Sequence, residues 1–131
     1  MNRQMVASYV RCRACGTILQ SIHTHDYKTC SCDNETMVDG GLDYQRYGGM
    51  DLSLVEPFAV YDDESFLKVR EHMYRGGHGK DMKGPFRLTR LFEMTDEHLN
   101  AMLTYPCPPW QLKLIKKEVQ YRKKRNISIA D

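Results

Sequence analysis

Residues 12–32 read CRACGTILQSIHTHDYKTCSC and hold four of the five cysteines of the chain. They form a C-x-x-C pair at Cys12 and Cys15 and a C-x-C pair at Cys30 and Cys32. A zinc ion prefers about four soft or borderline ligands in a tetrahedron, and two close pairs brought together by a short hairpin supply them. The spacing predicts a zinc ribbon in which the four cysteines bind one structural Zn²⁺.

The residues after each pair favour the turns that a metal site needs. Gly16 directly follows the first pair, where the backbone N–H groups must turn toward the sulfurs and a Cβ would clash. Asp33 and Asn34 follow the second pair and take up the same turn less comfortably.

Two disulfides are the alternative to a metal site, and they would require an oxidising compartment. The first ten residues lack the apolar run of a signal peptide, so we expect a cytoplasmic protein with reduced thiols. The fifth cysteine, Cys107, lies between two prolines and is expected to be a free thiol.

Two histidines lie between the cysteine pairs. If residues 17–25 form one strand, the period of two places His23 and His25 on the same face, with Asp26 following them. These residues could brace the metal ligands through hydrogen bonds or contact a partner. One histidine could instead replace a cysteine at the zinc, or the three residues could hold a separate catalytic metal. The sequence leaves these alternatives open.

Length and charge limit the architecture. A chain of 131 residues suits one domain, or a small metal-stapled lobe with a slightly larger partner lobe. No window approaches the roughly 18 apolar residues of a membrane span, and we expect no membrane association. The net charge of +2 is uneven, because residues 111–131 carry +5 and the first 110 residues carry −3. A basic end of this kind often binds an acidic partner, although solubility alone can explain it.

The pattern up to residue 61 predicts short strands. We expect strands over 7–12, 17–25, 36–38 and 42–47, and an extended linker or edge strand over 50–61. In the fourth of these, Tyr44 and Arg46 would share a face, and Tyr44 would cover the small ribbon core or, less favoured, stack on a base.

The pattern after residue 61 predicts helices. Asp62 and Asp63 would cap a helix that Gly76 and Gly77 end, and a glycine-rich loop over 75–84 would follow. A strand over 86–92 leads to a short helix capped by Thr95. A final basic helix runs from about 110 to 125. Its apolar face is formed by Leu112, Ile115 and Val119, and Asn126 is expected to end it. The fold class is therefore α+β: a zinc-ribbon-like domain over 1–49 and a small α+β lobe over 50–131.

Four strings together resemble a family of small, largely uncharacterised phage and prophage proteins with an N-terminal zinc-ribbon-like segment. They are RCRACG (11–16), SIHTHD (21–26), CSC (30–32) and VDGGLDYQR (38–46), with Asp33 where a glycine often follows the C-x-C pair. The string FEMTDEHLNAML (92–103) is similar to a tail found on several small phage proteins. The resemblance implies a phage origin and a zinc-bound N-terminus and gives weight to the HTHD and VDGG residues. It implies no reaction.

Three functions are carried forward. The leading hypothesis, by analogy, is a phage-encoded zinc-binding interaction protein that binds and modulates a host protein machine of transcription, replication or anti-phage defence. The alternative is a nucleic-acid-binding zinc-ribbon module, and the third is a metal-dependent hydrolase that uses His23, His25 and Asp26. The candidate partner-binding residues are Tyr44, Arg46, Lys116, Lys117, Lys123 and Lys124.

Overall fold

The computed structural model describes residues 3–77 and 82–130, and the chain divides into two compact units at Glu64 and Ser65. Small antiparallel sheets and three α-helices make up the described residues, which is the α+β class that the sequence predicts. The N-terminal unit extends beyond the expected ribbon of residues 1–49, because residues 55–61 pair with the first strand. The expected glycine-rich loop falls partly on residues 78–81, outside the described residues.

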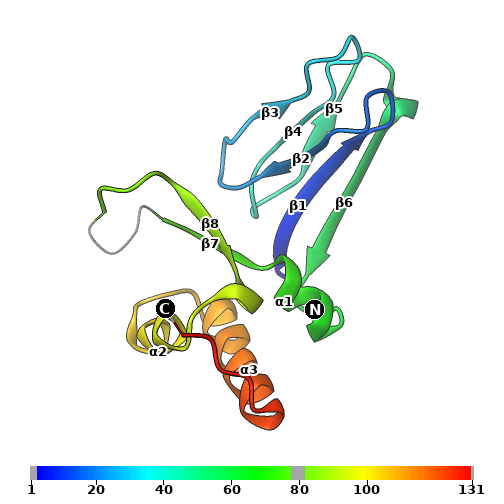
Figure 1. Ribbon diagram of the computed structural model, residues 1–131. Coiled ribbons are helices and arrows are strands. Elements are labelled where there is room, and N and C mark those ends of the chain that lie inside the picture. Colours follow the sequence, from blue (N-terminus) through cyan, green and yellow to red (C-terminus); the bar gives the residue numbers. More distant parts are fainter. Residues whose placement is uncertain (1–2, 78–81, 131) are drawn as a thin grey trace. The chain divides into compact units, whose positions relative to one another are not determined.

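Two three-stranded antiparallel sheets form the N-terminal unit (Figure 1). The first has the strand order β2–β1–β6 and the second has the order β3–β4–β5. The elements are β1 (Met5–Cys12), β2 (Ile18–Ser21), β3 (Lys28–Thr29), β4 (Met37–Asp39), β5 (Arg46–Gly48), the 3₁₀ turn η1 (Leu52–Leu54) and β6 (Val55–Tyr61). The expected second strand is shorter than predicted, and β3 is an addition to the prediction.

The core of this unit lies around β1, the central strand of the first sheet. Every residue of β1 except Arg11 is buried. Val10 packs with Val38 of β4 and Val55 of β6, so the two sheets share one small apolar cluster. Pro57 lies opposite Val10 on β6, an edge strand, which is the kind of strand in which proline is tolerated.

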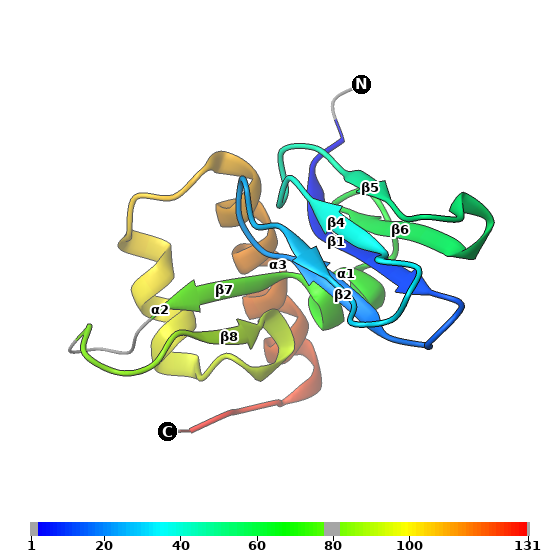
Figure 2. The same cartoon turned by 90° about the horizontal axis from the view of Figure 1, so that it is seen from above.

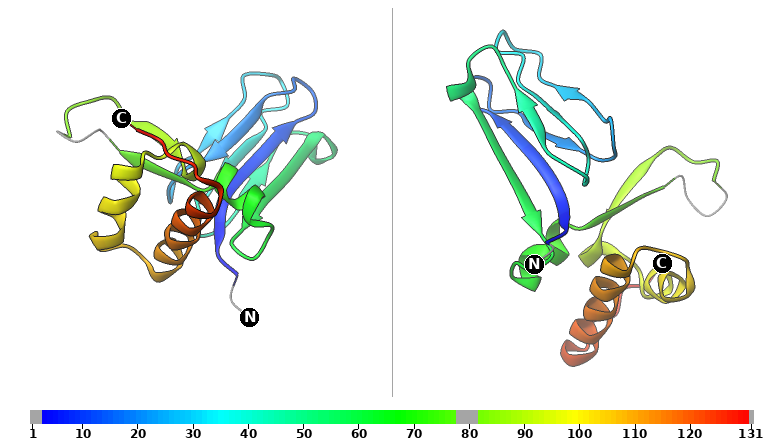
Figure 3. Two further views of the ribbon diagram at one scale, coloured as in Figure 1. Left: turned by 60° about the horizontal axis from the view of Figure 1, so that its bottom comes forward. Right: turned by 180° about the vertical axis from the view of Figure 1, so that it is seen from behind.

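The C-terminal unit combines a two-stranded hairpin with three helices. Figure 2 shows β7 and β8 side by side, and Figure 3 shows α2 beside α3. The elements are α1 (Phe66–His72), β7 (Tyr74–Gly77), β8 (Arg87–Arg90), the 3₁₀ turn η2 (Leu91–Glu93), α2 (Asp96–Thr104) and α3 (Pro109–Arg125). No helix in the described part of the chain is long and apolar enough to cross a membrane.

The start of α1 differs from the prediction. Its N-cap is Ser65, without a side-chain hydrogen bond, and Asp62 and Asp63 do not cap it. Asp62 instead accepts a hydrogen bond from the Gln4 N–H at 2.9 Å, and Asp63 pairs with Arg3. The reason is that β1 and β6 pair as far as Met5 and Tyr61, which brings these acidic residues beside the start of β1.

The end of α1 also differs from the prediction. The helix ends at His72, and Gly76 and Gly77 belong to β7 rather than to a helix stop.

The buried face of α3 contains charged residues that the apolar pattern does not reveal. Glu118 and Arg122 are buried beside Leu114 and Ile115, whereas the expected Leu112 and Val119 are only half-buried. Glu118 accepts hydrogen bonds from Arg70 and Arg122, and these ion pairs satisfy the buried charges. Two helix ends follow the prediction: the Thr95 hydroxyl caps α2 and Asn126 ends α3 with a φ of 54°.

Candidate metal centre

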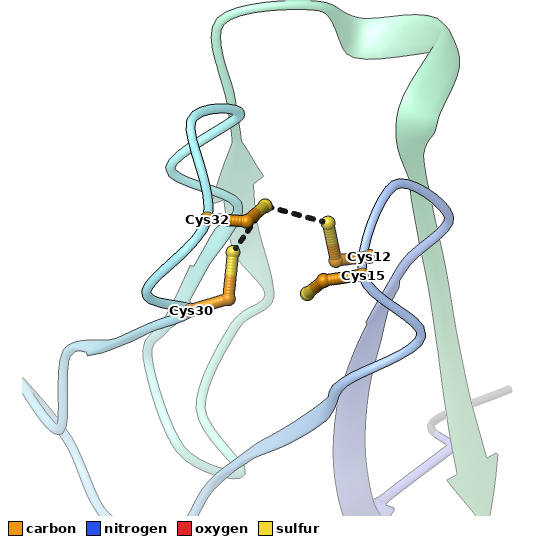
Figure 4. A group of neighbouring side chains, drawn as sticks. All are labelled: Cys12, Cys15, Cys30 and Cys32. Atoms are coloured by element: carbon orange, nitrogen blue, oxygen red, sulfur yellow. Dashed lines mark hydrogen bonds between the residues drawn. The ribbon is translucent and has the colours of Figure 1, made fainter.

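Two turns of the N-terminal unit bring the four paired cysteines together. Cys12 ends β1 and Cys15 lies in the turn that follows it, while Cys30 and Cys32 lie between β3 and β4. Their sulfur atoms all lie within 4.8 Å of one another, and Figure 4 shows the side chains converging from two separate turns. Cys12 Sγ is 3.6 Å from Cys32 Sγ, which is 3.4 Å from Cys30 Sγ.

The first turn is closed by backbone hydrogen bonds around Gly16. The Gly16 N–H donates to the Cys12 carbonyl at 2.7 Å, and the Cys12 N–H donates to the Thr17 carbonyl at 2.9 Å. Gly16 has a φ of +79°, a left-handed conformation that glycine adopts at little cost. The prediction that Gly16 takes up the turn after the first cysteine pair is therefore confirmed.

The second turn is closed by a similar pair of bonds. The Cys30 N–H donates to the Thr36 carbonyl at 2.9 Å, and the Glu35 N–H donates to the Cys32 carbonyl at 3.0 Å. The left-handed residue is Glu35, with a φ of +49°, rather than Asp33 or Asn34 as the sequence suggests. The second turn therefore closes three residues after its last cysteine, whereas the first turn closes one residue after Cys15.

Asn34 is buried and joins the second turn to the chain before β6, a role that the sequence does not predict. Its side-chain nitrogen donates to the Thr36 hydroxyl at 2.8 Å, and its side-chain oxygen accepts from the Asp51 N–H at 2.8 Å. The Met50 N–H donates to the Asn34 carbonyl at 2.7 Å. The first turn is also joined to the chain before β6, because the Arg13 N–H donates to the Leu54 carbonyl.

The spacing of the sulfurs fits a metal ion. With Zn–S bonds near 2.3 Å, tetrahedral geometry places the sulfurs about 3.8 Å apart. The Cys30–Cys32 and Cys12–Cys32 sulfur pairs, at 3.4 and 3.6 Å, are slightly tighter than this and far longer than the roughly 2.05 Å of a disulfide bond. All four thiols are free, as is Cys107. Four thiols at metal-binding distance are the donor set that zinc prefers.

The thiols of the cluster differ in how readily they ionise. A hydrogen bond from the Thr36 side chain is the main cause that lowers the pKa of Cys12 to about 6. At Cys32 a backbone hydrogen bond from Asn34 lowers the pKa, but contacts with Cys30 together with burial outweigh it and raise the pKa to about 12. Adjacent thiolates repel one another, and a divalent cation offsets that repulsion.

The histidines lie outside this cluster. Strand β2 ends at Ser21, so His23 and His25 are not on one strand face, and that prediction is wrong. Both side chains are exposed, and His25 has a φ of 65° in the turn that ends the strand. The Asp26 carboxylate accepts from the Ile22 N–H at 2.8 Å and pairs with Lys28 at 3.3 Å. Asp26 therefore closes the turn and does not join the histidines.

Among residues 3–77 and 82–130, the four paired cysteines are the only group of three or more Cys, His, Asp or Glu side chains gathered closely enough for a metal ion. His23 Nδ1 lies 3.1 Å from the Thr24 carbonyl oxygen. The described geometry thus gives no support to a histidine ligand at the cluster or to a separate catalytic metal on His23, His25 and Asp26.

The VDGG string packs against the HTHD turn. The Gly41 N–H donates to the Ser21 hydroxyl at 2.9 Å, and that hydroxyl donates to the Asp26 carbonyl. A Cβ on Gly41 would lie 2.7 Å from His23 Cα, so a larger residue has no room. The Thr24 hydroxyl also donates to the Asp43 carboxylate. We call residues 22–26 and 40–44 the paired turns.

Tyr44 and Arg46 do not form a shared face. Tyr44 precedes β5, is 43% exposed and packs its ring against Gly40, so the prediction that it covers the ribbon core is wrong. Arg46 lies in β5 and pairs with the buried Asp39 at 2.8 Å. The chain turns back at Gly40 and Gly41, which both have positive φ, and β5 therefore begins only at Arg46.

The four candidate lysines of α3 are exposed. Three of them, Lys116, Lys117 and Lys124, line a groove together with Phe66 and Tyr121. The fourth, Lys123, does not line that groove.

The fold and the cluster define a small α+β protein with a four-cysteine site at metal-binding distance. Residues 4–49 match a family described as "Domain of unknown function (DUF7695)". This match spans both cysteine pairs, the HTHD turn and the VDGG string. No curated protein and no solved structure matches the chain.

Proposed function

We propose that the N-terminal unit is a structural zinc module and that the protein acts by binding another protein. The observation that carries the zinc proposal is the convergence of four free thiols from two turns within 4.8 Å. Zn²⁺ bound by Cys12, Cys15, Cys30 and Cys32 would have four protein ligands and no open position for a substrate. Such an ion crosslinks the turn after β1 to the turn before β4, which is how it stabilises the fold.

The protein-binding role is supported by exposed groups on a fixed backbone. His23, His25 and Tyr44 are exposed on the paired turns, and hydrogen bonds through Ser21 and Asp26 hold the backbone beneath them. Tyrosine contributes strongly at protein interfaces because it offers a large contact area with few rotatable bonds. The phage origin that the resemblance implies belongs to this proposal, as does the host protein machine, which rests on analogy.

The nucleic-acid alternative has less support from the N-terminal unit. Its first 64 residues contain five Lys and Arg against ten Asp and Glu, a net charge of −5. Binding to nucleic acid draws much of its free energy from cations placed on phosphates, so a surface of this sign opposes it.

Metal analysis of the purified protein tests the zinc proposal. We expect one zinc per chain, lost together with the folded state of the N-terminal unit in Cys12→Ser and Cys30→Ser, because zinc binding free energy is also folding free energy in such sites. His23→Ala and His25→Ala are the matched controls and should keep the zinc. Elemental analysis and circular dichroism provide the readouts.

Three results would contradict the zinc proposal. Disulfides in the purified protein or the absence of bound metal would remove the site. Loss of zinc in a histidine variant would replace the four-cysteine assignment with one that includes that histidine.

Affinity purification from host cells tests the protein-binding role. A host protein should be retained by the wild type, weakly by the His23→Ala/Tyr44→Ala double variant and normally by Met50→Ala. Met50 is the control because it is 75% exposed in the same unit but lies outside the paired turns. Equal retention by all three proteins would show that the paired turns are not the contact surface.

A further inference from the structure

The C-terminal unit carries a groove of about 430 Å³ along α3, which we call the α3 groove. Phe66 of α1 and Tyr121 of α3 lie in it, with ring centroids 5.9 Å apart. Its charge comes from four lysines and one arginine: Lys113, Lys116, Lys117, Lys124 and Arg125. The groove therefore combines aromatic rings with a rim of ammonium groups.

The lysines of the rim lie on one face of the helix. Positions three, four and eleven residues apart fall close together around an α-helix, and Lys113, Lys116, Lys117 and Lys124 have this spacing. At 1.5 Å per residue the row is about 16 Å long. Within the described ranges, none of these four lysines has a carboxylate at ion-pair distance. The one acidic residue of α3, Glu118, is buried and bound to Arg70 and Arg122.

The Tyr121 ring is already engaged by two guanidinium groups. Arg70 Cζ lies 4.3 Å and Arg125 Cζ 4.0 Å from its centroid. Arg70 is fixed in turn by two hydrogen bonds to Glu118, at 2.8 and 2.9 Å. A ring held in this way adds apolar edge to the groove, but a nucleic-acid base could stack on it only by displacing an arginine.

We propose that the α3 groove binds an acidic amphipathic helix of the partner protein. One or two apolar side chains of that helix would contact Phe66 and the edge of Tyr121, while its Asp and Glu carboxylates would pair with the lysine rim. Recognition of a helix in a groove uses anchors of this kind at helical spacing. The inference rests on the proposed protein-binding role for its class of partner, but it involves a different unit from the metal centre.

Single-stranded nucleic acid is the competing occupant, and the groove is less suited to it. Such binding combines a basic path with aromatic faces on which successive bases stack. The α3 groove has the basic path, but the Tyr121 ring is engaged by Arg70 and Arg125. The charge complementarity with a carboxylate-rich helix remains, and the aromatic edges favour a ligand with apolar side chains.

Fluorescence anisotropy with two labelled probes tests the proposal on the full-length, metal-loaded protein. The first probe is a synthetic helix of about 14 residues with leucine at every third or fourth position and glutamate elsewhere, long enough to span the lysine row. The second is a single-stranded deoxyoligonucleotide of the same net charge. The groove variant is Lys116→Gln/Lys117→Gln/Lys124→Gln. The matched control is Lys123→Gln, an exposed lysine of α3 outside the groove.

We expect the peptide to bind the wild type and the Lys123→Gln control alike. It should bind the groove variant at least about tenfold more weakly, because three charge pairs are lost. Replacing its leucines by serine should weaken peptide binding to the wild type by a similar factor. The oligonucleotide should bind more weakly than the peptide at physiological salt.

Two results would overturn the inference even if the peptide binds. Tighter binding of the oligonucleotide than of the peptide would identify a nucleic-acid site, and equal losses per lysine replaced in the groove and control variants would identify nonspecific charge attraction. Zinc content measured on the same samples separates the two proposals. Failed peptide binding with one zinc per chain refutes the groove alone, whereas a metal-free protein with intact peptide binding refutes the zinc module alone.

Discussion

At Gly41 the chain has no room for a side chain. Its φ is +59°, and a Cβ there would lie 2.7 Å from both Cα and O of His23. The left-handed conformation costs an ordinary L-residue about 1–2 kcal/mol, and the clash with backbone atoms must be relieved by moving one of the paired turns. We expect Gly41→Ala to lower the free energy of unfolding of the metal-loaded protein by about 2–4 kcal/mol in urea denaturation.

Gly16→Ala is the matched control for this substitution. Gly16 also has a positive φ, of +79°, but a Cβ there meets nothing within 4 Å. It should therefore lose only the conformational term, about 1–2 kcal/mol. Equal losses in the two variants would show that the contact between the paired turns contributes nothing beyond backbone strain.

Sequence spacing could predict which cysteines gather, and the four paired cysteines do lie within 4.8 Å of one another. Close cysteine pairs such as Cys12 and Cys15 are held by their own short turns, so the convergence of their thiols is readable from local sequence. The placement of His23 was not readable, because its face depends on where β2 ends. That end is set by Asp26, which accepts the Ile22 N–H and turns the chain. No pattern in the sequence marks Asn34 as the residue that joins the second turn to residues 50 and 51.

At the scale of the elements, α3 is anchored by buried charge. Glu118 is fully buried and accepts hydrogen bonds from Arg70 of α1 and Arg122 of its own helix. Arg122 also donates to the Leu91 carbonyl at 3.1 Å and to Asp96 at 3.1 Å, which connects α3 to η2 and α2. The hydrogen bonds to Glu118 raise the pKa of Arg70. One carboxylate thus joins two helices and holds both arginines.

We expect Glu118→Gln to lower the free energy of unfolding by about 2–4 kcal/mol, because it leaves the largely buried Arg70 without its counter-ion and removes one of the two carboxylates that pair with Arg122. Chemical denaturation followed by circular dichroism provides the measurement. Glu93→Gln, an exposed change in the same unit, should shift stability by no more than about 0.5 kcal/mol. A loss for Glu118→Gln as small as that of the control would mean that the arginines find other partners.

Local signals predicted the ends of the helices better than their buried faces. Thr95 and Asn126 act within one turn of the chain, and both behave as the sequence indicates. The predicted buried face of α3 was wrong in part. Arg122 and Glu118 have the chemistry of surface residues, and their burial depends on partners from other elements. Asp62 and Asp63 have the chemistry of helix caps, but the pairing of β1 with β6 places them where they bind Gln4 and Arg3 instead.

At the scale of the whole molecule, the two units carry net charges of opposite sign. The sequence up to Glu64 carries −5, and the sequence from Ser65 carries +7, with fourteen Lys and Arg against seven Asp and Glu. The prediction placed the boundary after residue 49, since residues 50–61 look like a linker with a proline. Strand pairing across more than 40 residues of chain decides otherwise, and pairing of that range is not visible in local sequence.

The single tryptophan, Trp110, lies in α3, while all four thiols of the metal centre lie before Glu64. Each half of the protein therefore has its own optical signal. Tryptophan fluorescence follows the C-terminal half during denaturation, and a chromophoric chelator that captures the zinc proposed for the thiol cluster follows the N-terminal half. Recording both signals from one sample distinguishes cooperative unfolding of the chain from stepwise loss of its halves, without adding a label to either.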